Sequence, residues 1–284
     1  MKRKILWLFV LLPSFVTAQT NDAALLKRQK VAQVRIYLGT RLAATDRYDT
    51  RGNLIASSEE DFLLESVQRS RIQQFNAQSQ VVSLKIKISG DRDTIFWHYH
   101  YNERHQLVAT TVGYPEKSIE LRVYDSTGKL ARITQVDPTG QLTSEETFAY
   151  NRSGQEVASR RVMAGSREQI KRTTYDQQGR LIREQLFNGD DLFSTQWTAY
   201  RPNGQKSKVT CAEPDETTGI AFTYDRHNRL VSRCHFTLEQ GPEVTTGTEE
   251  FTYTPTGLIK TYAENIFSSS GTKRVFSYEY TYSK

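Results

Sequence analysis

Thr-Tyr-Asp-Gln-Gln-Gly-Arg-Leu, residues 174–181, is the segment on which most of this chain is patterned. It is typical of the end of one strand, a tight turn and the start of the next strand. Asp176 suits the first corner of a type I turn, because its carboxylate accepts hydrogen bonds from backbone N–H groups just ahead. Gly179 supplies the left-handed residue that completes a three-residue hairpin connection. Tyr175 before the turn and Leu181 after it favour strands.

Versions of this segment recur about every 25 residues, nine times in all. The copies begin at Tyr48, Phe75, Tyr101, Tyr124, Tyr150, Tyr175, Tyr200, Tyr224 and Tyr253. The left-handed position holds Gly52, Gly128, Gly154, Gly179, Gly204 and Gly257, and it holds His105, Asn228 and Ser79 in the other three copies. His and Asn are enriched at positive φ. The Phe75 copy departs most from the pattern.

A second set of turn signals lies between these turns, so each repeat contains two strands of about eight residues. The sequence therefore predicts an all-β, antiparallel hairpin-repeat array of about nine repeats. About 18 strands at ~4.8 Å spacing would be ~86 Å wide if flat, and the twist of a sheet forbids that. The sheet must curl with its aromatic face inward, as an open shell, a spiral or a closed barrel. The low apolar content of 37% and mean hydropathy of −0.61 indicate a thin core, and we predict an open or spiral β-shell.

The start of the chain predicts export. Lys2-Arg3-Lys4 precedes an apolar run and a small-residue cleavage pattern at Val16-Thr17-Ala18, which is typical of a secretory signal peptide. We expect residues 1–18 to be the signal peptide, 19–47 an N-terminal leader with a first strand, and 48–284 the repeat domain.

Charge argues against a nucleic-acid partner, and hydropathy argues against a membrane-spanning helix. Removing the three basic residues of the signal lowers the formal charge from +6 to +3 (6 − 3), and that excess is spread along the chain. We therefore expect no nucleic-acid partner. No segment of the mature chain is apolar enough for a transmembrane helix. The only plausible helix is residues 21–33, residues 34–38 look like a first strand, and residues 57–65 interrupt the pattern as a loop or a helical turn.

Tyr-Asp-x-x-Gly-Arg-Leu, as in Tyr175 to Leu181, resembles the YD repeat of the RHS family. The segments beginning at Tyr124 and Tyr48 match it nearly as well, and the likeness covers most of the mature chain. The copy at Tyr200 also resembles a MORN-type repeat, which belongs to a second family of hairpin arrays. Large RHS proteins wind such repeats into a β-shell that can enclose a toxic domain. This chain has nine copies and repeats almost to its end, so the resemblance implies a small secreted relative and no toxin.

Candidate chemistry is sparse. His98 and His100 share one face of a strand, with His105 nearby, and two such histidines can hold a metal. No acidic or Cys partner is placed beside them by the sequence, and His105 fits its turn, so we predict no metal and no cofactor. The sequence contains no nucleophile elbow, phosphate loop or metalloprotease helix. Since the repeat aspartates are explained by their turns, we predict that the protein is not an enzyme.

Cys211 and Cys234 are the only cysteines. Export favours a disulfide between them. In a regular meander, however, their strands would be ~9.6 Å apart, beyond the ~4.4–6.8 Å Cα separation of a bridge. The sequence leaves both states open.

Three functions compete. The leading hypothesis is an exported, non-enzymatic scaffold that binds a protein or glycan in the periplasm, at the cell surface or outside the cell. The second is an outer-membrane β-barrel, permitted by strand number, hairpin spacing and export. Against it, strands such as residues 181–187 carry a charge on each face, whereas a lipid-facing wall needs an apolar band ~25 Å tall. The third is a secreted hydrolase whose site the sequence does not reveal.

Overall fold

The computed structural model of this protein describes residues 23–61, 67–88, 94–114, 116–238, 242–266 and 272–283. The expected signal peptide lies outside the described residues. The described chain contains one short helix and 20 strands. In chain order they are α2 (Ala23–Arg28), β1 (Val31–Leu38), β2 (Arg41–Tyr48), β3 (Leu54–Asp61), β4 (Val67–Phe75), β5 (Val81–Ile88), β6 (Thr94–Tyr101), β7 (Leu107–Tyr114), β8 (Glu116–Tyr124), β9 (Leu130–Val136), β10 (Leu142–Tyr150), β11 (Glu156–Met163), β12 (Gln169–Tyr175), β13 (Leu181–Asn188), β14 (Asp191–Tyr200), β15 (Lys206–Ala212), β16 (Thr217–Tyr224), β17 (Leu230–Leu238), β18 (Glu243–Tyr253), β19 (Ile259–Ile266) and β20 (Thr272–Tyr282).

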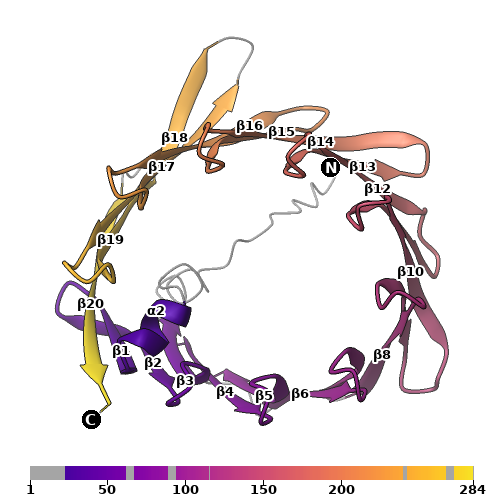
Figure 1. Ribbon diagram of the computed structural model, residues 1–284, viewed down its shortest axis with the longest axis horizontal. Helices are drawn as coiled ribbons and strands as arrows, with labels where there is room; N and C mark the ends of the chain where they lie inside the picture. Colours follow the sequence, from indigo (N-terminus) through magenta and orange to yellow (C-terminus); the bar gives the residue numbers. More distant parts are fainter. Residues whose placement is uncertain are drawn as a thin grey trace.

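The sheet closes on itself. β1 pairs antiparallel with β2 on one side and with β20 on the other, so the first and last strands meet. The remaining strands pair with their neighbours in sequence, and Figure 1 shows the resulting ring. The all-β prediction is confirmed, but the predicted open or spiral shell is wrong. The chain forms a closed 20-stranded antiparallel β-barrel. Closure is physically favoured because it removes the two sheet edges that an open shell would leave unpaired.

The register climbs steadily around the wall. Directly opposed residues run from Asp46 on β2 to Arg71 on β4 and Ile95 on β6. They lie two, four and six residues before the aromatic residue that opens the next turn (48 − 46, 75 − 71 and 101 − 95). A shift of two residues per repeat, or about one per strand, tilts the strands as barrel closure requires.

One face of the wall lines the lumen. α2 lies inside the ring beside β1 to β3 (Figure 1), and its Leu26 belongs to one buried cluster with Val34 and Ile36 of β1. Alternate residues of a strand point to opposite sides, so the cross-strand pairs carry this assignment around the ring. The lumen side receives Trp97, Tyr99, Phe148, Phe222, Phe251, Phe276 and Tyr278. The outer side receives Phe96 and Trp197 among others.

The hydrophobic core lies at the seam where β1 meets β20. Its buried members are Leu26, Val31, Val34, Ile36, Ala43, Ala44, Phe251, Leu258, Ile259, Tyr262, Phe276 and Tyr278. The Tyr262 ring packs against Phe251 and Phe276, with centroids 5.3 and 5.8 Å away. Burial of these side chains under α2 stabilises the closure by the hydrophobic effect.

The two ends of the described chain are also joined by hydrogen bonds. The Lys30 carbonyl accepts the backbone N–H of Ser283 at 2.7 Å, and the Gln29 side-chain amide donates to the Thr256 carbonyl at 2.9 Å. The segment between α2 and β1 is thereby fixed to both the last strand and the turn before β19.

The N-terminal elements differ from their predicted bounds. Within the described residues the predicted helix is present as α2 and ends at Arg28, and residues from Val31 onward pair with β20 as a strand. The interruption expected over residues 57–65 is partly strand, since β3 continues to Asp61 and pairs with β4. Its three acidic residues, 59–61, did not prevent pairing, because Glu59 and Glu60 form ion pairs with Arg69 and Arg41.

Candidate functional sites on the two faces of the wall

The repeat turns form one rim of the barrel, and Figure 1 shows them bending toward the axis while the opposite hairpins flare outward. In the turn of residues 174–181, Gly179 has φ 78° and donates its N–H to the Asp176 carbonyl at 3.0 Å. The Asp176 carboxylate accepts the N–H groups of Gln178 and Arg180, both at 2.9 Å. The same left-handed geometry occurs at Gly52, Ser79, His105, Gly128, Gly154, Gly204, Asn228 and Gly257.

These hydrogen bonds act on the turn aspartates as acids. At Asp125, the Thr127 hydroxyl and the Lys129 N–H hold the pKa of the carboxyl below its usual value. A carboxylate that accepts several hydrogen bonds is stabilised in its charged form. The carboxylates of the turn aspartates are therefore engaged in hydrogen bonds within their own turns.

The repeat tyrosines tie each turn to the one before it. The Tyr175 hydroxyl donates to the Glu156 carbonyl at 2.8 Å, just after the preceding turn. Equivalent bonds of 2.5–2.9 Å are made by Tyr101, Tyr124, Tyr150, Tyr200, Tyr224, Tyr253 and Tyr280. Phe75 has no hydroxyl, and Tyr48 instead lies 3.5 Å from Asp46. Most of the repeat residues selected from the sequence thus have an architectural role.

The lumen wall beside the seam carries a buried ionic cluster. Glu249 on β18 is 8% exposed and contacts His235 Nε2 at 2.7 Å and Arg233 Nη1 at 3.3 Å. Burial alone would raise the pKa of Glu249, but the His235 hydrogen bond and the Arg233 charge hold it below its usual value. Tyr262 hydrogen-bonds to nearby Glu264 at 3.1 Å. This cluster is a charged patch on the wall with its acid already paired.

A second acid, Asp46 on β2, lies on the lumen side under the seam. It is 1% exposed, and burial raises its pKa to about 6, while hydrogen bonds from Ser57 and Tyr48 act in the opposite direction. One of its two carboxylate oxygens has no hydrogen-bond partner in the described part of the chain. Asp46 belongs to no motif, so sequence reasoning did not identify this buried acid.

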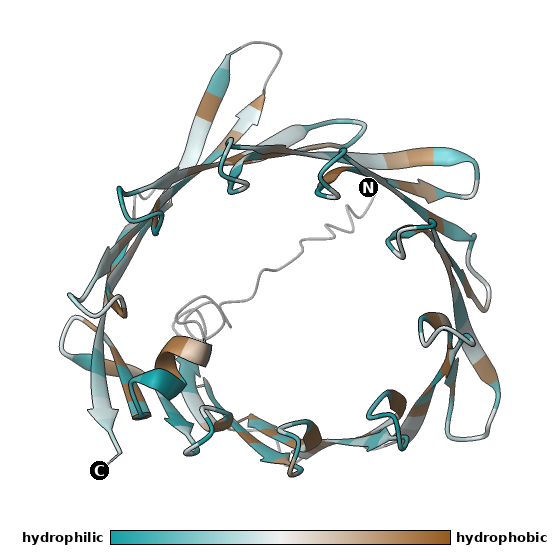
Figure 2. Cartoon of the chain, in the orientation of Figure 1, coloured by the Kyte–Doolittle hydropathy of each residue, from teal (hydrophilic) through white to brown (hydrophobic). Residues whose placement is uncertain are grey.

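The outer face mixes charged and apolar side chains through the middle of the strands, and Ile72, Phe96 and Leu121 are among its exposed apolar residues. Exposed outward charges include Arg35, Arg47, Lys85, Lys87, Arg132, Arg160, Arg172, Arg183, Glu250 and Glu279. Figure 2 shows hydrophilic and hydrophobic residues mixed along the wall. Among the described residues, none of the helices has the length and hydropathy needed to cross a bilayer.

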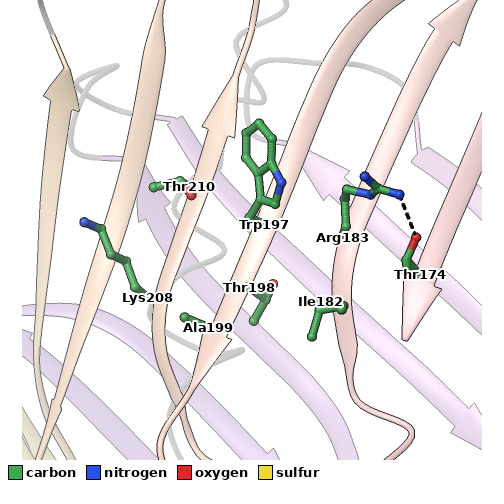
Figure 3. A pocket seen from close by; sticks show the side chains of 8 residues that line it. All are labelled: Thr174, Ile182, Arg183, Trp197, Thr198, Ala199, Lys208 and Thr210. Carbon is green, nitrogen blue, oxygen red and sulfur yellow. Dashed lines mark hydrogen bonds between the residues drawn. The ribbon is translucent and has the colours of Figure 1, made fainter. Parts of the chain in front are cut away.

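Trp197 on β14 is an exposed aromatic residue on the outer face. It is 44% exposed and lines a hollow of about 370 Å³ together with Arg183, Lys208 and Thr210 (Figure 3). Arg183 on β13 and Thr210 on β15 are its direct cross-strand partners. Strand alternation predicts side-chain direction only once the inner face is known, so the sequence alone did not single out this residue.

The three histidines that could have been metal ligands occupy different parts of the fold. His98 and His100 lie on the outer face of β6, whereas His105 occupies the left-handed position of the following turn, with φ 60°. In the described part of the chain, no group of three or more His, Cys, Asp or Glu side chains is arranged to hold a metal ion.

The two cysteines lie on opposite faces of the wall as free thiols. Cys211 on β15 pairs with Gln196 and Thr218 on the lumen side. Cys234 on β17 pairs with Ala221 and Thr248 on the outer side.

Comparison with known proteins gave structural neighbours only. No family model and no curated protein matches the chain. A porin-like protein from Bacteroides uniformis superposes with a TM-score of 0.42 at 8% identity, covering 88% of this chain and 98% of that one. The TcdB2–TccC3–Cdc42 structure gives a TM-score of 0.36 at 13% identity, covering 83% of this chain but 16% of that one. TcdB2–TccC3 without its hypervariable C-terminal region gives 0.35 at 13% identity, again with 16% of that chain covered.

The chain therefore spans a small part of the TcdB2–TccC3 chains that it matches. TM-scores below 0.5 at these identities fix neither a family nor an activity for it.

Proposed function

We propose that this chain is an exported, non-enzymatic β-barrel of the cell envelope whose lumen is its working compartment. The observation that carries the proposal is the pairing of β1 with β20, which closes 20 strands into one wall. Barrels of 16–18 strands already leave an aqueous channel, so side chains cannot fill a lumen of this width. The lumen wall carries the paired ionic cluster of Glu249 and Arg233 and aromatic surface at Trp97, a combination suited to polar ligands, glycans or peptides.

Closure supports the outer-membrane β-barrel over the open scaffold. The scaffold hypothesis needed a concave sheet open to large partners, and that surface is now the inside of a barrel. Transmembrane barrels require full closure and, in single-chain bacterial examples, have an even number of strands. The 20 antiparallel strands of the closed ring meet both requirements. The expected signal peptide agrees with export to the envelope.

A water-facing barrel in the periplasm is the second candidate, and the outward charges favour it. Arg35, Arg160 and Arg172 are exposed near the middle of β1, β11 and β12. An Arg or Lys on the lipid face costs about 2–4 kcal/mol at the bilayer midplane. A wall that carries such residues on many strands is better solvated by water than by lipid.

One fractionation experiment separates these locations. The full chain, with its own signal, is expressed in a Gram-negative host, and the envelope is extracted with alkaline carbonate beside a porin and a periplasmic marker. The outer-membrane barrel predicts retention in the membrane pellet, whereas release without detergent, which the outward charges favour, would identify the water-facing barrel. Retention with the porin, followed by solute uptake into liposomes reconstituted with the purified protein, would establish the outer-membrane barrel.

A separate measurement tests the open lumen. In a Trp197→Phe background, Trp97 is the remaining tryptophan of residues 19–284 and faces the lumen. Acrylamide should quench its fluorescence, while a quencher attached to a protein larger than the lumen should not. Fluorescence shielded from acrylamide would show a filled interior and would overturn the proposal.

The non-enzymatic part rests on the roles of the acids. The turn aspartates hold their own turns, and Glu249 is paired with His235 and Arg233. A hydrolase activity in the purified barrel that Glu249→Gln removes, with the fold intact, would contradict it.

We also infer kinship with the YD-repeat proteins of the RHS family. Its support is the repeated turn and the tyrosine-to-carbonyl bonds between turns. A profile built from the nine turn segments should retrieve YD-repeat sequences ahead of MORN-type sequences, and the reverse ranking would contradict the kinship.

A further inference from the structure

The ring of Trp197 is not covered by a cation of the described chain, in contrast to the rings of Phe96 and Phe187 on the same outer face. The Lys85 ammonium lies 5.5 Å from the Phe96 centroid, and the Arg172 guanidinium lies 4.7 Å from that of Phe187. Such cation–π contacts occupy one face of a ring. Within the described residues, no equivalent contact is present at Trp197. A flat, amphipathic surface therefore remains free to stack on a ligand.

The Trp197 surface continues into a groove. The hollow of about 370 Å³ beside Lys208 adjoins a second one of about 500 Å³, and both are lined by Trp197 and Arg183. The second hollow adds Leu192 and Phe193, which are 49% and 45% exposed. Together the two hollows extend the binding surface beyond one ring, across β13 to β15.

Arg183 supplies a charge beside the ring. Its described contact is a long hydrogen bond of 3.4 Å to the Thr174 hydroxyl, drawn in Figure 3. In contrast, Arg132 pairs with Glu145 on the same outer face. No ion pair involves Arg183 in the described part of the chain. Its guanidinium can therefore bind a planar carboxylate with two parallel hydrogen bonds.

We propose that the outer groove at Trp197 and Arg183 binds a carboxylated polysaccharide. The apolar C–H face of a pyranose ring stacks on the indole, and the carboxylate of a uronic acid pairs with Arg183. Thr174 and Thr210 bring hydroxyl groups to the same hollow for the sugar hydroxyls. An apolar peptide would satisfy Leu192 and Phe193 but would leave Arg183 unpaired. This site lies on the opposite face from the lumen and rests on the water-facing location of the barrel, but its binding test is independent of what the lumen does.

The experiment titrates the mature barrel with a short oligogalacturonate by calorimetry, beside its methyl ester and a neutral dextran oligosaccharide. In a Trp97→Phe background, the fluorescence of Trp197 should change with the same midpoint, which locates the ligand. Arg183→Gln should weaken galacturonate binding roughly tenfold and leave binding of the methyl ester unchanged, because only the acid engages the guanidinium. Trp197→Ala should weaken both roughly tenfold or more.

Matched variants keep the result interpretable. Phe96→Ala removes an outward aromatic residue of similar exposure, 42%, from another part of the wall and should leave binding unchanged. Trp197→Phe retains a stacking surface and should bind with intermediate affinity. Each variant is first shown to have an unchanged thermal midpoint. The proposal is overturned if the barrel does not bind galacturonate, if Phe96→Ala weakens binding as much as Trp197→Ala, or if dextran sulfate competes equally in all variants, which would indicate non-specific charge attraction.

Discussion

At the seam, twelve apolar side chains of α2, β1, β2 and the segment from β18 to β20 form one buried cluster. In the described wall from β5 to β17, Phe236 is the only apolar side chain buried to that degree. The wall is linked instead by tyrosine-to-carbonyl bonds between successive turns, such as that from Tyr175 to Glu156. Contacts between neighbouring repeats add up locally, whereas closure depends on residues far apart in the chain. We therefore expect the seam to determine whether the ring is closed.

The largest expected effect comes from removing apolar volume at the seam. Ile36 is 1% exposed, and Ile36→Ala should lower the free energy of unfolding by about 2–5 kcal/mol, as large-to-small changes in packed cores do. Ile133, on the lumen side of β9, is only half-buried, so Ile133→Ala should cost about 1 kcal/mol. Urea unfolding followed by circular dichroism measures both. Equal losses would show that the seam has no special role.

The second effect concerns Asp46, the acid buried at the seam. Its pKa of about 6 exceeds the ordinary value of 3.8, so the folded barrel binds this proton more tightly than the unfolded chain does. Protonation of Asp46 therefore favours folding most below about pH 4, where the carboxyl is neutral in the folded barrel. This effect declines as the pH rises to about 6, and at higher pH the buried carboxylate disfavours folding by a constant amount. Asp46→Asn should flatten this part of the profile and raise stability at pH 7 by up to about 3 kcal/mol.

Asp125, a turn aspartate, provides a control whose contribution to stability has the opposite pH dependence. The pKa of Asp125 is lowered by its hydrogen bonds, so its contribution is present above its ordinary pKa and is lost as the pH falls. Asp125→Asn should therefore reduce stability at neutral pH and have less effect in acid. The same pH response in both variants would refute the contrast between seam and turn.

The repeat wall could be predicted from the sequence because its signal is local and repeated. The Asp and Gly of each turn have one conformational role, visible in the segment of residues 174–181 alone. Closure has no such signal, because β1 and β20 lie about 240 residues apart and their pairing belongs to no repeat. The available hint was an alternation of apolar and polar residues in both strands. It places Val34 and Ile36 on one face of β1, and Phe276 and Tyr278 on one face of β20.

The candidate sites were harder to predict for a related reason. Which face of a strand points inward is fixed by closure, so Trp197 could not be assigned to the outside from its own strand. Asp46 and Glu249 are isolated acids in sequence, and they become distinctive only when folding buries them beside Tyr48 and His235. Sequence reasoning found the turns and missed the contacts made between distant strands.

A smaller effect tests the tyrosine bonds that link the wall. Tyr175→Phe removes one hydroxyl and leaves the Glu156 carbonyl without that donor, so it should cost about 1 kcal/mol. Phe75 provides the reverse change: Phe75→Tyr places a hydroxyl where the repeat pattern puts the Leu54 carbonyl and should add about 0.5–1 kcal/mol. Urea midpoints measure both. If neither variant shifts the midpoint, the turn-to-turn bonds do not stabilise the wall.

The smallest expected effect is at the cysteines, which both lie in the repeat wall. Cys211 faces the lumen and Cys234 faces outward, so the intervening backbone separates the two thiols. We expect denatured, unreduced protein to react with two equivalents of a thiol reagent. Changing both residues to Ser should leave the unfolding midpoint nearly unchanged, whereas loss of a disulfide typically costs about 2–5 kcal/mol. A bridge would require β15 to β17 to leave their register and would give the wall a long-range covalent link. Absence of thiol reactivity, with a large loss of stability in the double variant, would mean that the wall is held by more than its neighbouring turns.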